Sequence, residues 1–178
     1  MEEQVGQLWH RLITRAARSD HPQAAVTLDS VRKQVSVIFR ALGGDSGLRI
    51  QAAGATDSLA RRGWLKRIAG IDAQVELAWR DEQSLCLPQQ LAVFPDAQLN
   101  RELYRWLAAL AAQRADATLP WLAYSQALTL SALERYPGLR PRYQRLVEAL
   151  LAQRPDPRRL PADEAAQERA VQAALRDP

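Results

Sequence analysis

Few residues in this chain are of types that carry out catalysis, and their spacing does not form a catalytic set. Ser46 is flanked by glycines in the segment Gly-Gly-Asp-Ser-Gly at 43–47. A nucleophilic serine needs a general base and an oxyanion hole, but the only histidines are His10 and His21, both near the N-terminus. We interpret 43–47 as a turn between a helix and a strand. A small hydrolase that uses Asp45 and Ser46 is the minor alternative.

Metal and nucleotide chemistry have equally little support. His10, His21 and Cys86 are too few and too widely separated to form a zinc site. The chain has no HExxH or CxxC motif and no glycine-rich phosphate-binding loop. Cys86 is the single cysteine, which excludes an intrachain disulfide and is compatible with a reducing compartment. We expect no cofactor, no metal site and no enzymatic activity.

A basic segment around one tryptophan is the strongest candidate for a contact surface. The run Ala-Arg-Arg-Gly-Trp-Leu-Lys-Arg at 60–67 places four cations beside Trp64. An anionic partner could be held by the cations while the indole packs against it. The alternative is a solvated basic face whose Trp64 and Leu65 point into the core. The predicted partner-binding residues are Arg61, Arg62, Trp64, Lys66 and Arg67.

The composition is that of a globular protein of one domain, or of one domain with an appendage. The chain has 178 residues, of which 47% are hydrophobic, and a net charge of +4. Nearly all the positive charge is arginine, but acidic residues are interspersed with it, so a nucleic-acid-binding arm is not indicated. A basic nucleic-acid-binding domain stays the alternative function. No apolar run approaches the length of a membrane span, and the N-terminus lacks the order of a secretion signal. We expect a cytoplasmic protein.

Apolar residues at three- and four-residue spacing predict helices over most of the chain. The central one lies in the stretch 91–114, where Asp96 is placed to cap its first turn. Thr27 is a plausible cap for a helix that ends at Gly43-Gly44. The predicted helices are 3–18, 28–42, the one after Asp96, 121–136, 141–153 and 162–176, with a short helix or ordered loop at 58–68.

Two segments alternate with the period of strands instead. We predict a strand at about 48–53 and a β-hairpin at about 74–87, closed by Pro88. The fold class is therefore α+β: a predominantly α-helical domain with a small antiparallel β-sheet. We expect the domain to span 1–153, followed at 154–178 by a proline-marked linker and a weak terminal helix.

Four stretches together resemble a known family. They are LWHRLITRAAR, HPQAAVTLDSVRKQVSVIFRALGG, RRGWLKRIAG and LAVFPDAQLNRELYRWLAALAA. In order and spacing they are similar to the N-terminal region of the NorD/CbbO family of von Willebrand factor A domain proteins. The likeness covers roughly residues 5 to 130, and none of the four stretches is a catalytic motif.

The resemblance implies a role in protein remodelling. Such proteins pair with a hexameric ATPase of the MoxR branch of AAA+ proteins, and a metal-dependent adhesion site in their von Willebrand factor A domain grips an acidic residue of the client. The client is Rubisco or nitric oxide reductase. This chain has no DxSxS metal motif, so no metal ligand can be carried over. We therefore expect a non-enzymatic adaptor module, the N-terminal domain of a longer protein with a C-terminal part missing here.

Overall fold

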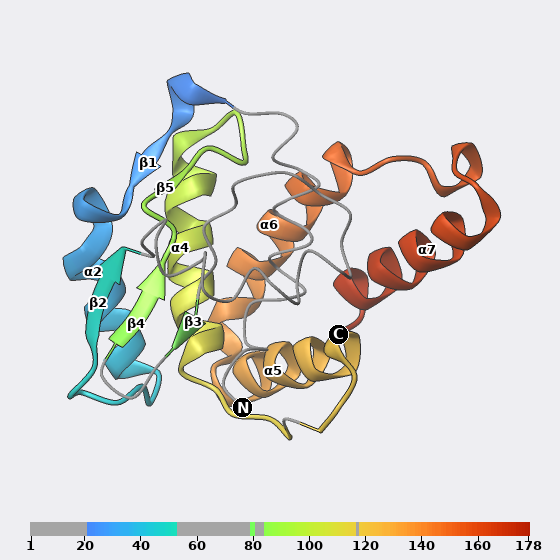
Figure 1. The fold of residues 1–178 in the computed structure, drawn as a ribbon. Helices are drawn as coiled ribbons and strands as arrows, with labels where there is room; N and C mark the ends of the chain where they lie inside the picture. Colours follow the sequence, from blue (N-terminus) through green and yellow to red (C-terminus); the bar gives the residue numbers. More distant parts are fainter. Residues whose placement is uncertain (1–20, 53–78, 81–83, 117) are drawn as a thin grey trace, which may run out of the picture.

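The computed structural model describes residues 21–52, 79–80, 84–116 and 118–178 (Figure 1). Within these ranges the chain is a predominantly helical α+β domain, which confirms the predicted class. The helices are α2 (Leu28–Ala41), α4 (Ala97–Ala111), α5 (Trp121–Arg135), α6 (Arg140–Gln153) and α7 (Ala162–Arg176), with 3₁₀ turns η1 (Pro22–Ala24), η2 (Pro137–Leu139) and η3 (Pro157–Arg159). The strands are β1 (Val26–Thr27), β2 (Arg49–Ala52), β3 (Trp79–Arg80), β4 (Ser84–Leu87) and β5 (Gln90–Leu91).

The bounds of these five helices agree with the periodicity of the sequence. Asp96 caps α4 as predicted, because its side chain accepts a hydrogen bond of 2.7 Å from the backbone N–H of Gln98. Thr27 occupies the N-cap position of α2 without a side-chain hydrogen bond to the helix. The predicted helices at 3–18 and 58–68 lie outside the described residues.

The larger sheet has the order β2-β4-β3 and is mixed. Antiparallel pairing of β3 with β4 confirms the predicted hairpin in its described part. The strand at 49–52 instead joins β4 in parallel, so that Arg49 lies opposite Ser84, and this corrects the expected antiparallel arrangement. Alternation in sequence specifies which face of a strand is buried, but it does not specify the direction of its neighbour. A separate antiparallel pair, β1 with β5, was not predicted.

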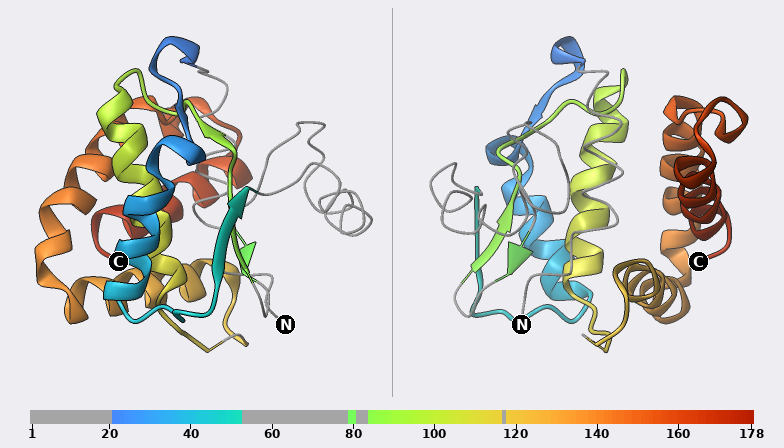
Figure 2. Two further views of the ribbon diagram at one scale, coloured as in Figure 1. Left: turned by 90° about the vertical axis from the view of Figure 1, so that its left-hand side faces the viewer. Right: turned by 45° about the vertical axis from the view of Figure 1, so that its right-hand side comes forward.

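Helix α4 lies at the centre of the domain. Figure 2 shows the sheet on one side of α2 and α4, with α5, α6 and α7 on the other. From Leu103 onward all but one of its residues are buried, since the helix is covered on both sides. No helix of the described part is long and apolar enough to cross a membrane.

Asn100, on α4, is fully buried and uses its whole amide group. Its Oδ1 accepts from the N–H of Phe94 at 3.0 Å, and its Nδ2 donates to the carbonyls of Phe94 and Ala24, both at 2.9 Å. One turn further along, the Tyr104 hydroxyl donates to the carbonyl of Pro88 at 2.8 Å. Two polar side chains of α4 thus satisfy backbone groups of non-helical segments that would otherwise be buried unpaired.

Helix α7 packs against α5 and α6. Arg154 donates two hydrogen bonds of 2.6 Å to the carboxylate of Glu168, and both side chains are buried. The Tyr143 hydroxyl of α6 donates to the carbonyl of Leu175 at 2.8 Å. These contacts attach the terminal helix, whose buried residues include Val171. The division of the chain at residue 154 stays a prediction.

Replacing Asn100 by alanine is expected to destabilise the fold strongly. The change leaves the N–H of Phe94 and the carbonyl of Ala24 buried without partners, at about 1–3 kcal/mol for each group. We expect the free energy of unfolding, measured by urea titration, to fall by about 3 kcal/mol or more. The exposed neighbour Arg101 is the control, and Arg101→Ala should change it by less than about 0.5 kcal/mol. Equal losses in the two variants would contradict this account.

Burial raises the pKa of the Tyr143 phenol above its ordinary value of 10.0. Above pH 10 the unfolded chain therefore loses this proton while the folded chain retains it, and stability falls as the pH rises. Tyr143→Phe should weaken this alkaline decline, and it should cost about 1 kcal/mol at neutral pH through the lost bond to Leu175. Urea titrations at pH 7 and at several values above 10 test both effects. An unchanged alkaline slope would contradict the assignment.

Candidate functional site

The predicted contact residues Arg61, Arg62, Trp64, Lys66 and Arg67 all lie outside the described residues. Their role as a partner-binding segment stays a prediction.

The other candidates from the sequence are placed in ways that fit structural roles. Residues 43–47 form a turn after α2: Gly43 has a φ of +90°, and the N–H of Gly47 donates to Asp45 Oδ1 at 2.8 Å. Cys86 is buried in β4. In the described ranges, no group of three or more His, Cys, Asp or Glu could hold a metal ion.

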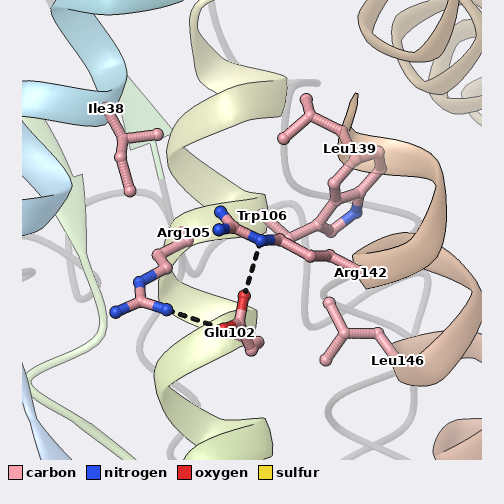
Figure 3. Close-up of a pocket in the computed structure, with 7 residues that line it drawn as sticks. All are labelled: Ile38, Glu102, Arg105, Trp106, Leu139, Arg142 and Leu146. Carbon is pink, nitrogen blue, oxygen red and sulfur yellow. Dashed lines mark hydrogen bonds and ion pairs between the residues drawn. The ribbon is translucent and has the colours of Figure 1, made fainter. Parts of the chain in front are cut away.

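A pocket opens over the middle of α4, between α2 and α6 (Figure 3). We call it the α4 groove. The empty space between its lining side chains is about 250 Å³, a figure that counts space open to solvent. The helices on its two sides both pack on α4, and their side chains form its walls. The residues that line it are Ile38 of α2, Glu102, Arg105 and Trp106 of α4, Leu139 of η2, and Arg142 and Leu146 of α6.

A carboxylate at the centre of the groove connects the three helices. Glu102 is 7% exposed, and its Oε1 accepts from Arg105 Nη1 at 2.6 Å and from Gln98 Nε2 at 3.2 Å. Arg105 extends the network to α2 by donating to Gln34 Oε1 at 2.8 Å. On the opposite side, Arg142 Nε lies 3.7 Å from Glu102 Oε2. The network therefore holds two guanidinium groups against one carboxylate.

Apolar side chains surround this charged centre. Trp106 is buried and packs against Tyr143, with ring centroids 4.9 Å apart. On the α2 wall Ile38 is half-buried, and its neighbour Val37 is 66% exposed. Val37 and Ile38 lie on the same face of α2 as Gln34. Because Gln34 accepts a hydrogen bond from Arg105 of α4, this face of α2 is turned toward the groove. An exposed valine therefore extends the apolar surface at the rim.

Positive charge is concentrated on the three helices that bound the groove. Together α2, α4 and α6 carry eight cationic and three anionic residues, whereas α5 and α7 carry three cationic and four anionic ones. These three helices therefore carry most of the net positive charge of the described helices. The cations of the first set are Arg32, Lys33, Arg40, Arg101, Arg105, Arg140, Arg142 and Arg145, and its anions are Asp29, Glu102 and Glu148.

This arrangement is suited to binding. The groove combines an apolar surface, a buried acceptor and a half-exposed guanidinium, and protein interfaces likewise place a desolvated apolar core inside a polar rim. Arginine and tryptophan, both present here, are the side chains most enriched among energetically dominant contact residues.

This site was not predicted from the sequence, and no role was assigned to Glu102 or Arg105. The available signal was the three-residue spacing of these two residues, which brings opposite charges together on a helix. The contribution of Arg142 could not be foreseen, because it depends on how α6 packs against α4.

Fold and site together define a helical α+β domain with a groove over its central helix, and comparison with known proteins identifies its family. The chain is 51% identical over all 178 residues to Protein NorD of Stutzerimonas stutzeri. It is 48% identical, over the same length, to an uncharacterized protein of Pseudomonas aeruginosa. It is also 38% identical over 167 residues, 87% of the chain, to Protein NorD of Brucella suis.

The chain belongs to the NorD family. The aligned residues make up 29% of each of the first two relatives and 26% of the third, so the chain spans less than a third of their length. No family model matches the chain, and no solved structure matches it.

Replacing Glu102 by glutamine is expected to loosen the groove. The change removes the charge that holds Arg105 and Arg142 over α4, while Arg105 keeps Gln34 and solvent as partners. We expect the free energy of unfolding to fall by about 1–2 kcal/mol, less than for a fully buried pair. The exposed Glu148 of α6 is the control, since Glu148→Gln should have almost no effect. A neutral Glu102→Gln variant would show that the network does not hold the helices together.

Proposed function

We propose that this chain is a non-enzymatic adaptor module of a NorD-family protein. In this role it takes part in coupling a MoxR-type AAA+ ATPase to the activation of a client enzyme in the cytoplasm. The client we propose is nitric oxide reductase rather than Rubisco, because the family resemblance implies that enzyme for the NorD branch and two of the relatives described above are named NorD.

The α4 groove is the observation that carries this proposal. It provides a surface built by three helices that together carry an excess of cationic residues, with an exposed apolar side chain at its rim. Hydrogen bonds to Glu102 and Gln34 hold the side chain of Arg105 in one position. A rigid surface of this kind loses little conformational entropy when a partner binds.

Most of the length of the relatives lies outside this chain. That length has room for the von Willebrand factor A domain that the family resemblance implies. We therefore assign binding of the client enzyme to that domain, and binding of the ATPase to the residues described here. This division of roles gives each part a separate binding partner.

The proposal predicts that the 178-residue chain binds its cognate MoxR-type ATPase. Size-exclusion chromatography with light scattering should show co-elution of the chain with the hexamer, in the absence or the presence of ATP. A hexameric AAA+ ATPase from another branch serves as the control and should elute separately. If the folded chain elutes alone in both nucleotide conditions, docking on the ATPase lies elsewhere in the longer protein and the assignment is wrong.

A further inference from the structure

The two oxygens of Glu102 have very different surroundings. Oε1 accepts hydrogen bonds from Arg105 and Gln98, but Oε2 has no hydrogen-bond partner among the described residues, although the side chain is only 7% exposed. A buried acceptor without a hydrogen bond is unfavourable, and the charge of Oε2 is offset by the guanidinium group of Arg142, whose Nε lies 3.7 Å away. Figure 3 shows Oε2 on the side of Arg142.

Arg142 is the cation of the groove with the most capacity for a further partner. Its side chain is 46% exposed, and its Nε lies 3.7 Å from Glu102 Oε2, beyond hydrogen-bond distance. By contrast, Arg105 is 23% exposed and donates to both Glu102 and Gln34. A guanidinium group can bind a carboxylate through two parallel hydrogen bonds. Arg142 can therefore receive a carboxylate from a partner without breaking the bonds around Arg105.

The charges of the surround decide the class of partner. Eight cations against three anions on α2, α4 and α6 favour an acidic ligand. Within the groove, however, apolar side chains such as Ile38 and Leu146 offer a phosphate backbone nothing to bind. These features favour an acidic protein segment over a nucleic acid.

We propose that the α4 groove docks an acidic segment of the partner ATPase, an inference that rests on the proposed function. A carboxylate of that segment binds Arg142, and a large apolar side chain next to it packs on Ile38 and the exposed rim at Val37. The carboxylate is thus recognised beside the buried Glu102–Arg105 pair, and the apolar contact supplies the remaining affinity.

Two pairs of variants of the 178-residue chain test this inference by measuring affinity for the purified ATPase hexamer. Arg142→Gln should weaken binding by about tenfold or more, since it removes a charge-assisted contact. The control Arg169→Gln removes the same charge from an exposed position on α7 and should leave affinity within about twofold. Val37→Ser should weaken binding by about fivefold. Its control is Leu130→Ser, on α5, where the leucine is also exposed.

The outcomes separate this inference from the proposed function. If the original chain binds the hexamer, and if Arg142→Gln and Val37→Ser bind as well as their controls, the groove is not the docking site although the adaptor role stands. If the original chain does not bind, both proposals fail together. Loss of a chain dimer in Arg142→Gln, with ATPase binding unchanged, would assign the groove to a second copy of this chain. Salt-sensitive binding of duplex DNA that Arg142→Gln abolishes, again with unchanged ATPase binding, would assign it to nucleic acid.

Discussion

The buried amide of Asn100 is the constraint on which the arrangement of this domain depends. Without hydrogen bonds from one polar side chain, the backbone at Phe94 and Ala24 could not be buried against α4. Hydrophobic burial is non-directional and would accept several positions of these segments. The amide accepts only one, because its donor and acceptor must both be matched. Hydrophobic burial therefore provides the stability of the domain, and Asn100 fixes the positions of the segments at Ala24 and Phe94 relative to α4.

The groove follows from the central position of α4. A helix covered by α2 on one side and by α6 on another leaves a strip of its own surface between them. Near the middle of the helix that strip carries Glu102 and Arg105, whereas beyond Trp106 the helix is apolar and fully covered. The change in composition along one helix thus separates a surface available for binding from the core that supports it. The ion pairs to Glu102 then connect the walls of the groove to its base.

Local features of the sequence predicted the helices well. Asp96 marked the start of the central helix, and the Gly43-Gly44 pair marked the end of the preceding one. Tertiary features were not predicted in the same way. The sequence pattern showed a strand near Ile50 but not its parallel pairing, and nothing in the spacing of Arg142 indicated a carboxylate on another helix. Caps and periodicity act within a few residues, whereas strand direction and ion pairs between helices depend on how distant segments pack.

The strand order of the mixed sheet has a consequence for the connection between β2 and β3. Gln51 of β2 and Trp79 of β3 both lie opposite Cys86, so the chain leaves β2 and enters β3 at the same end of the sheet. The two attachment points are therefore separated by about two strand spacings, roughly 10 Å. The cost of closing such a connection rises only slowly with its length. Strand register in this sheet therefore constrains only the two end points of the connection, and the pairing of β2 and β3 with β4 does not itself fix how many residues join them.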